Sequence, residues 1–543
     1  MDVGADEFEQ SLPLLQELVA GADFVGLDIE FTGLRSNLSR PQQISLFDLP
    51  SEWYLKTRQS VQQFTICQIA RVSLCSPGCP GTHSVDQAGL ELRNLPASAS
   101  QMLGLKHRRR VKQASSVQFL NQYGFDYNKF LKNGIPYMNE EQEKKIKHSI
   151  LRGDWRVRSS LDKDQIKVVI DKVTQWLDLA EESDQMTLPG ISVASPLGKL
   201  DTFEVQLVLR QALPNIWTVL KEEGVIVKKV SQPHRWYLEH ASCDQVSRWK
   251  EQILLSARGF SVFFQMLVKA QKQPLVGHNM MMDLLHLHEK FFRPLPESYD
   301  QFKQNIHSLF PVLIDTKNVT KDIWKELRFP RVSNLSEVYE VLSSNLNPTK
   351  DSGPAIIHAR QCKKYAETKC PHEAAYDAFL CGSVLLKVAH LLLQRVHGSD
   401  AVQEPAFPQY LDVLAPYVNQ VNLIRAGVPK INFSGPDYPS IRPPVLILTV
   451  KKWPGVSEHH VYREFQNLCK FDVRRFTRSQ FLLLTNKFKD ARSVLKEYRN
   501  HPTLQVSLYR YWRHSPNITC LLQVCSIVTT WAMIAFLLGR PSS

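Results

Sequence analysis

The sequence predicts an α/β protein of several domains, and three observations support this prediction. The chain has 543 residues, enough for three or four domains that each bury a core. Helix-like and strand-like patterns alternate over 1–153 and again over 241–400, with a different pattern between them. Near the N-terminus, an apolar strand at Phe24–Phe31 contains two carboxylates, which an ordinary buried strand avoids.

Composition and charge narrow the classes of function. Hydrophobic residues make up 43% of the chain and charged residues 22%, as in ordinary globular proteins. The net charge of +13 favours a polyanionic partner. The ten cysteines show neither a CxxC pair nor the spacing of a zinc site or disulfide framework, which predicts reduced thiols facing the cytosol. The first residues are acidic and lack an apolar core, so we expect no secretory signal.

The first two predicted elements are a helix over 6–21 and the acidic strand. The helix would carry four leucines on one side: Leu12, Leu14, Leu15 and Leu18. In the strand, Asp28 and Glu30 share one face, because side chains alternate along a strand. Two like charges so close raise each other's pKa unless a cation lies between them, and such oxygen ligands suit Mg²⁺ or Mn²⁺. On this motif alone, a strand end with two solvated acids is an equal alternative.

Several further segments follow. A second strand begins at 64–69, and Phe119, Phe125 and Phe130 are expected core residues of the region 114–150. The core is expected in two segments, 1–153 and 241–400, with a small α/β module inserted between them at 154–240. A linker at 401–444, a C-terminal module at 445–512 and an apolar helix at 518–538 follow.

Each module is predicted from its order of elements. The inserted one would contain helices over 164–181 and 202–212 and a strand at 225–229. The C-terminal module reads βαββαβ, which is the order of an RNA-recognition-type (RRM-like) fold.

The apolar segment 518–538 has no charged residue and, as a helix, spans roughly 30 Å, the thickness of the membrane hydrocarbon. Arg510, Arg513 and His514 precede it and only Arg540 follows, which weakly places the main body in the cytosol. We therefore expect a single-pass tail anchor in the endoplasmic reticulum or the mitochondrial outer membrane. The alternative is a buried core helix, which is less favoured because nothing follows to cover it.

Two later stretches supply partners for the acidic strand. In 274–283, a short apolar strand runs into a helix that Asn279 could cap, which puts Asp283 in the first turn. In 371–377, a proline stands at a helix start, His372 follows it and Asp377 lies early in the helix. Taken alone, an acid in the first turn usually complements the helix dipole, and a lone histidine is usually an exposed surface residue without a catalytic role.

Together these residues resemble the active site of the DEDD family of 3′→5′ exonucleases: Asp28, Glu30, Asp283, Asp377 and His372. The histidine subclass is indicated, because the tyrosine subclass would place a tyrosine where Glu373 stands. The phrases at 276–280 and 132–137 and the inserted module resemble the poly(A)-specific ribonuclease family. With the terminal anchor, the chain is similar to a membrane-tethered branch of that family that trims pre-piRNA 3′ ends in germ cells.

The resemblance implies a ribonuclease-H-like core, Mg²⁺ dependence (with Mn²⁺ possible) and a Tudor-type scaffold as partner. The four carboxylates would hold two metals about 4 Å apart, one activating water and one stabilising the leaving 3′ oxygen. His372 would take the proton from the attacking water. We expect an exoribonuclease that trims short single-stranded RNA, piRNA precursors or poly(A) tails, and releases 5′-nucleotides. The alternative is a non-catalytic, membrane-bound RNA-binding or scaffold protein, and the membrane anchor disfavours a DNA exonuclease.

The accessory modules depart from their families. The inserted one resembles a single-strand-binding module named for its Arg-x-x-x-His signature, but Pro214 stands four residues after Arg210. In the C-terminal module, 445–450 has no aromatic residue and 480–483 offers one ring, Phe481, where RNA-recognition folds stack two or three bases. Five basic residues could contact phosphate or form a solvated face: Lys451, Lys452, Arg474, Arg475 and Arg478.

Residues 70–112 break the family pattern. Prolines and glycines over 77–89 discourage a strand, and 76–106 resembles a translated Alu repeat. We expect the strand of Asp28 to lose a neighbour and expose an unpaired edge, so this form would be impaired in folding and activity. A segment that loops out harmlessly is the alternative.

Overall fold

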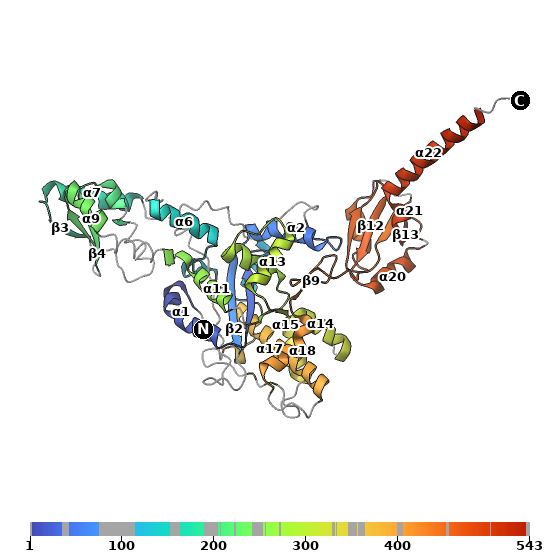
Figure 1. Cartoon of the computed structure of the whole chain (residues 1–543), viewed down its shortest axis with the longest axis horizontal. Coiled ribbons are helices and arrows are strands. Elements are labelled where there is room, and N and C mark those ends of the chain that lie inside the picture. The colour runs from blue at the N-terminus through green and yellow to red at the C-terminus, as the bar shows by residue number, and fades with distance from the viewer. Residues whose placement is uncertain are drawn as a thin grey trace. The chain divides into compact units, whose positions relative to one another are not determined.

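The computed structural model describes most of the chain. The described residues are 3–34, 43–74, 114–152, 163–188, 205–206, 208–221, 224–241, 254–255, 257–270, 273–327, 332, 334–345, 354, 356, 364–398, 405–451, 455–499 and 501–538. They fall into two compact units (Figure 1). The first unit comprises Met1–Pro41, Leu55–Asn422 and Lys430–Asp437; the second comprises Gln42–Tyr54, Leu423–Pro429 and Tyr438–Ser543.

The first unit is built on a mixed sheet, as the α/β prediction requires. Its strand order is β2-β1-β6-β7, formed by Ile66–Leu74, Phe24–Phe31, Leu275–Gly277 and Leu313–Asp315. Strand β1 is antiparallel to β2 and parallel to β6, and β6 is parallel to β7. The apolar side chains of β1 are buried, which explains why this strand lies inside the sheet.

The expectation that the strand of Asp28 loses a neighbour is wrong. Strand β2 continues to Leu74 and pairs with β1 along its whole length, from Phe24 opposite Leu74 to Phe31 opposite Ile66. The arginine, valine, serine and leucine that begin the unusual segment therefore extend the strand instead of ending it. The remainder of the predicted replacement, 75–112, lies outside the described residues.

Helices make up most of the other regular structure in these parts of the chain. Their bounds are α1 Ala5–Ala20, α2 Pro50–Gln63, α4 Ala114–Gln122, α5 Tyr127–Lys132, α6 Glu140–Arg152, α11 Phe260–Lys269, α12 Met281–Leu287, η2 His288–Phe292, α13 Tyr299–Leu309, α14 Thr316–Leu327, α15 Leu335–Asn345, α16 Lys364–Glu367 and α17 Ala374–His397. Leu15 of α1 is fully buried, but Leu14 is exposed, so the predicted apolar side of this helix is narrower than expected. Phe130 belongs to the core as predicted, whereas Phe119 is exposed.

The interval 401–444 is not the simple linker that was predicted. It contains α18 (Phe407–Leu414), a 3-10 turn at Ala415–Tyr417, β8 (Gln420–Asn422) and β9 (Lys430–Asn432). The ring of Phe407 stacks on Phe24 of β1, with centroids 5.2 Å apart. This segment is ordered despite its proline-rich composition, because the apolar side chains of α18 are buried in the core around α17.

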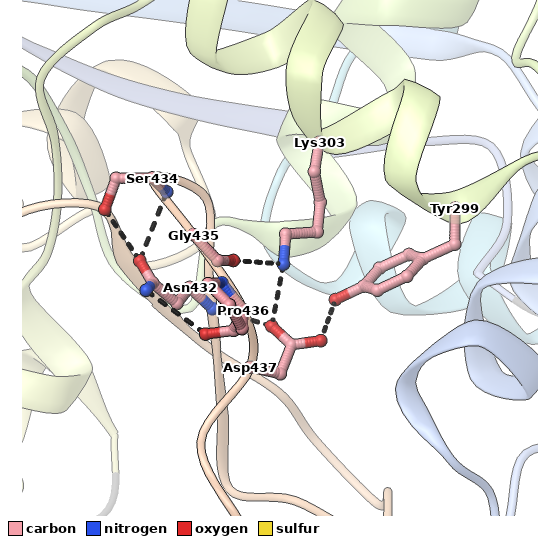
Figure 2. A network of polar contacts seen from close by, with 7 residues as sticks. All are labelled: Tyr299, Lys303, Asn432, Ser434, Gly435, Pro436 and Asp437. Carbon is pink, nitrogen blue, oxygen red and sulfur yellow. Dashed lines mark hydrogen bonds and ion pairs between the residues drawn. The ribbon is translucent and has the colours of Figure 1, made fainter.

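A polar clamp fastens the end of this interval to α13 (Figure 2). The ammonium of Lys303, nearly buried, donates to the carbonyl of Gly435 at 2.8 Å and pairs with Asp437 Oδ1 at 3.0 Å. The hydroxyl of Tyr299 donates to the other oxygen of Asp437 at 2.8 Å. A buried lysine is stable only when paired in this way, so the clamp fixes the segment after β9 to α13 within the first unit.

The inserted module holds a small sheet of order β3-β5-β4, with strands Gln185–Leu188, Gly224–Lys229 and Ile216–Lys221. The first predicted helix and the last predicted strand are present, as α7 (Lys163–Leu179) and β5, and α9 (Gln232–Ala241) follows. Within the second predicted helix, 202–212, the described residues 205–206 and 208–212 are helical. Arg210, the remaining residue of the signature, lies 3.7 Å over the Trp217 ring and donates to the Thr218 hydroxyl at 2.6 Å. These contacts give Arg210 a structural role within the module.

The C-terminal module has the predicted βαββαβ order. Its elements are β10 Leu446–Val450, α19 Glu458–Phe465, β11 Phe471–Arg475, β12 Gln480–Thr485, α20 Phe488–Glu497 and β13 Leu504–Leu508, with strand order β11-β12-β10-β13. Phe481 is fully buried in the core that the sheet shares with its helices, so this ring is not available to stack on a base.

The chain continues through α21 (Tyr511–His514) into α22 (Pro516–Leu538), which contains the predicted apolar segment. Large apolar side chains of α22 are exposed, among them Leu521, Ile527 and Trp531. By length and hydropathy, one described helix is long and apolar enough to cross a membrane, and it is α17, most of whose apolar stretch is buried inside the first unit. Membrane insertion of α22 stays a prediction.

Candidate active site

Strand β1 provides two carboxylates. Asp28 lies opposite Ala70 and Glu30 opposite Gln68 on β2. Both side chains face the same side of the strand, as the alternation of the sequence predicts. Their neighbours Leu27 and Ile29 point the other way and are buried, which fixes the register of the acids.

A tight turn after β6 positions Asp283 in the first turn of α12. At Gly277, an added Cβ would lie 2.8 Å from the Met280 Cβ, so only glycine fits there. Asp283 is 7% exposed, so its carboxylate is buried beside the acids of β1. The prediction that Asn279 caps α12 is wrong: Met280 is the N-cap residue and no side chain caps it.

Asn279 instead belongs to a network centred on Asp315. This buried carboxylate accepts the backbone amides of Asn279 at 2.8 Å, Lys317 at 2.9 Å and Asn422 at 2.9 Å. The amide of the Asn422 side chain donates to Asn279 Oδ1 at 2.6 Å, and Asn279 adopts a left-handed backbone with φ of 62°. Asp315 therefore holds the turn that carries Asp283, and burial raises the pKa of Asp315.

Helix α17 brings Asp377 to the same place. The small residues Ala374 and Ala378 are fully buried in the core that includes Ala70 of β2, which lets the helix lie close to the sheet. The side chain of Gln68 accepts the amide of Ala374 at 3.1 Å and so caps the helix. The amide of His372 donates to Asp377 Oδ2 at 3.1 Å.

These contacts gather four carboxylates: Asp28, Glu30, Asp283 and Asp377. Burial, and then the negative charge of the other acids, raise the pKa values of Asp28 and Glu30 well above their usual range. Burial raises the pKa of Asp283 to about 8 and that of Asp377 to about 7. Each acid is thus held near others at a cost that a cation between them would remove.

His372 completes the site. Its ring nitrogen and the oxygens of Glu30 and Asp377 all lie within 4.8 Å of one another. The imidazole packs edge-on against Phe119 and Tyr123 of the α4 region, with ring centroids 4.6 and 4.5 Å away. Burial lowers the pKa of His372, so the ring is neutral near pH 7 and able to accept a proton. Its left-handed backbone, with φ of 63°, places it at the mouth of the site.

The arrangement fits divalent cations. Four carboxylates whose pKa values are raised by burial and mutual repulsion are the donor set that hard, oxygen-binding cations such as Mg²⁺ and Mn²⁺ select. A bound cation would hold the acids ionised, because opposite charge favours the deprotonated form. All five residues predicted from the sequence are therefore in one place. Sequence reasoning missed Gln68, Tyr123, Asp315 and Asn422, which position them.

Comparison with known proteins agrees with this geometry. A family model described as CAF1 family ribonuclease matches residues 3–385. The chain is 88% identical over 542 residues to Poly(A)-specific ribonuclease PNLDC1 of Mus musculus, with 100% of both chains covered. It is 27% identical over 529 residues to the Pre-piRNA 3'-exonuclease trimmer of Bombyx mori, covering 95% of this chain and 94% of that one. It is also 25% identical over 495 residues to Poly(A)-specific ribonuclease PARN of Xenopus laevis, covering 86% and 74%. The chain belongs to the CAF1 family of ribonucleases and is an exoribonuclease of that family.

Proposed function

We propose that the chain is a Mg²⁺- or Mn²⁺-dependent enzyme that trims single-stranded RNA from its 3′ end. The observation that supports this most is the gathering of Asp28, Glu30, Asp283 and Asp377 from three separate elements, with His372 beside them. A structural role would not need four acids that destabilise one another.

Each residue then has a role. Asp28, Glu30, Asp283 and Asp377 hold the cations, which when bound supply an activated water and stabilise the leaving 3′ oxygen. The neutral ring of His372 accepts the proton of the attacking water. Phe119 and Tyr123 keep that ring in place. The leaving group is the shortened RNA with a free 3′ hydroxyl, and the product is a 5′-nucleotide.

The substrate and the location form the finer part of the proposal. The likeness to a Bombyx mori protein named as a pre-piRNA trimmer supports piRNA precursors as substrates, and the names of the other relatives support poly(A) tails as a second class. Helix α22, with 23 residues and exposed apolar side chains, would anchor the protein to the endoplasmic reticulum or mitochondrial outer membrane. The rest of the chain would then face the cytosol, within reach of a Tudor-type scaffold.

A trimming assay tests the activity. Single-stranded RNA labelled at its 5′ end should shorten to a ladder of labelled products with Mg²⁺, and should stay intact with EDTA. RNA labelled at its 3′ end should release labelled mononucleotide at once. Asp283→Ala should abolish both, because losing one carboxylate loses a metal. Asp300→Ala is the matched control, since Asp300 also lies in the first turn of a helix but is exposed. Full trimming by Asp283→Ala, or trimming unaffected by EDTA, would refute the proposal.

A further inference from the structure

The sheet of the C-terminal module has an unusual outer face. In folds with this order of elements, single-stranded RNA stacks its bases on the face opposite the helices. Here Leu446, Leu448 and Phe481 face the helices, as members of their core. The residues that alternate with them face outward, yet Ile447 and Leu484 are 1% exposed and Asp472 is 8% exposed. The outer face is therefore covered around Asp472, Ile447 and Leu484, whereas Arg474, Gln505 and Ser507 on the same face are exposed.

Asp472 shows what covers it. One carboxylate oxygen accepts the backbone amide of Leu46 at 2.6 Å and the hydroxyl of Ser45 at 3.2 Å. The other oxygen pairs with the guanidinium of Arg425 at 2.6 Å. Arg425 has a left-handed backbone, with φ of 55°, which an arginine adopts only when its surroundings hold it there. The contacts come from two segments of the same unit that lie far apart in the sequence.

These two segments, 45–53 and Leu423–Pro429, are also joined to each other. The amide of Gly427 donates to the carbonyl of Asp48 at 2.7 Å, and a Cβ on Gly427 would approach that carbonyl to 2.8 Å. The indole of Trp53, a buried residue, donates to the carbonyl of Ile424 at 3.0 Å. The segments thus form one layer with its own hydrogen bonds, which we call the docked layer.

We propose that the outer face of this sheet is a docking surface for the docked layer of the same chain, and that it does not bind RNA. Three features disfavour RNA binding there. The face presents no exposed aromatic ring at the central strands, the docked layer already satisfies Asp472, and a free Asp472 would repel phosphate. This inference is independent of the proposed activity, since it concerns a different unit of the chain.

Crosslinking and hydrogen exchange test the inference on the full-length protein. RNA carrying 4-thiouridine at every uridine is crosslinked by ultraviolet light, and the attached peptides are mapped by mass spectrometry. We expect crosslinks elsewhere in the chain and none in the peptides that contain β10 and β12. In the absence of RNA, Asp472→Asn should speed exchange in the docked layer by about tenfold or more, because the ion pair and the strong acceptor are lost.

Two further variants separate docking from folding. Asp490→Asn, at an acid in the first turn of α20 of the same unit, should leave the exchange of the docked layer unchanged. Arg425→Gln removes the ion pair from the other side and should repeat the effect of Asp472→Asn while the exchange of β10 and β13 stays slow. Crosslinks to β10 or β12 in the parent protein, or unchanged exchange of the docked layer in both Asp472→Asn and Arg425→Gln, would overturn the proposal.

Discussion

Asp283→Asn should stabilise the metal-free first unit while it abolishes trimming. Asp283 is 7% exposed, and burial raises its pKa from 3.8 to about 8. At pH 7 without metal, the folded protein holds this group mostly protonated, whereas the unfolded chain ionises it. Because the folded pKa is the higher one, the stability of the parent is greatest below pH 4 and falls as the pH rises towards 8. An asparagine does not ionise, so the Asp283→Asn variant does not lose stability in this way as the pH rises.

The size of the effect follows from the pKa shift. The ordinary pKa of 3.8 lies about 3 pH units below pH 7. At about 1.36 kcal/mol per pH unit, the buried acid costs the parent about 4 kcal/mol of stability at pH 7. Asparagine replaces one oxygen of the buried carboxyl group with an amide donor, and a buried polar group with a changed hydrogen-bonding capacity costs about 1 kcal/mol. We therefore expect a gain of roughly 3 kcal/mol at pH 7 in EDTA, and a gain near zero at pH 5.

Hydrogen exchange of the β1 and α17 peptides in EDTA measures this gain, because a chain of two units need not unfold in one step. Asp300→Asn is the control and should change stability by less than about 0.5 kcal/mol. With saturating Mg²⁺ the order should reverse, since only the parent gains binding energy at a complete site. A variant that is less stable than the parent at pH 7 in EDTA, or a gain that does not grow with pH, would refute the reasoning.

Three other outcomes are expected. Tyr123→Ala should lower the trimming rate about tenfold, less than the roughly 10²–10⁴-fold loss for His372→Ala, because it loosens the histidine without removing it; a Tyr123→Ala rate equal to that of Tyr123→Phe would count against this role. Gln68→Ala should destabilise the start of α17 by about 1 kcal/mol, read as faster exchange of its first turn. Deleting 517–543 should move the protein from the carbonate-resistant membrane pellet to the supernatant and leave the trimming of naked RNA intact; a truncated protein that still resists extraction argues against the anchor.

The acids of the site were predictable because each stands where local patterns make it unusual. Asp28 and Glu30 interrupt an apolar strand, and Asp283 and Asp377 fall in first turns after recognisable starts. The residues that position them gave no such pattern. Asn422 lies 107 residues from Asp315 and reaches it only through the fold, in an interval whose composition predicted a linker.

The sequence also failed to predict two other features, the length of β2 and the covered face of the C-terminal sheet. The residues after Ile69 read as a break in the strand, but pairing with β1 along its whole length outweighed the weak local propensity. In the C-terminal module the order of elements was correct, but Phe481 faces the helices, and no pattern in the sequence indicated that other segments cover the outer face. Long-range contacts of this kind decide which face of a sheet is free, and periodicity within one strand cannot show them.

The number of Mn²⁺ ions bound per chain tests most directly whether the four carboxylates form a metal centre. Electron paramagnetic resonance of free Mn²⁺, titrated against metal-free protein, should show two bound ions in the parent and in Asp300→Ala. Asp28→Ala should lose at least one of them and lose trimming in parallel. Equal Mn²⁺ binding by the parent and Asp28→Ala, or no bound ion at Mn²⁺ concentrations that support trimming, would show that these acids do not hold the metal.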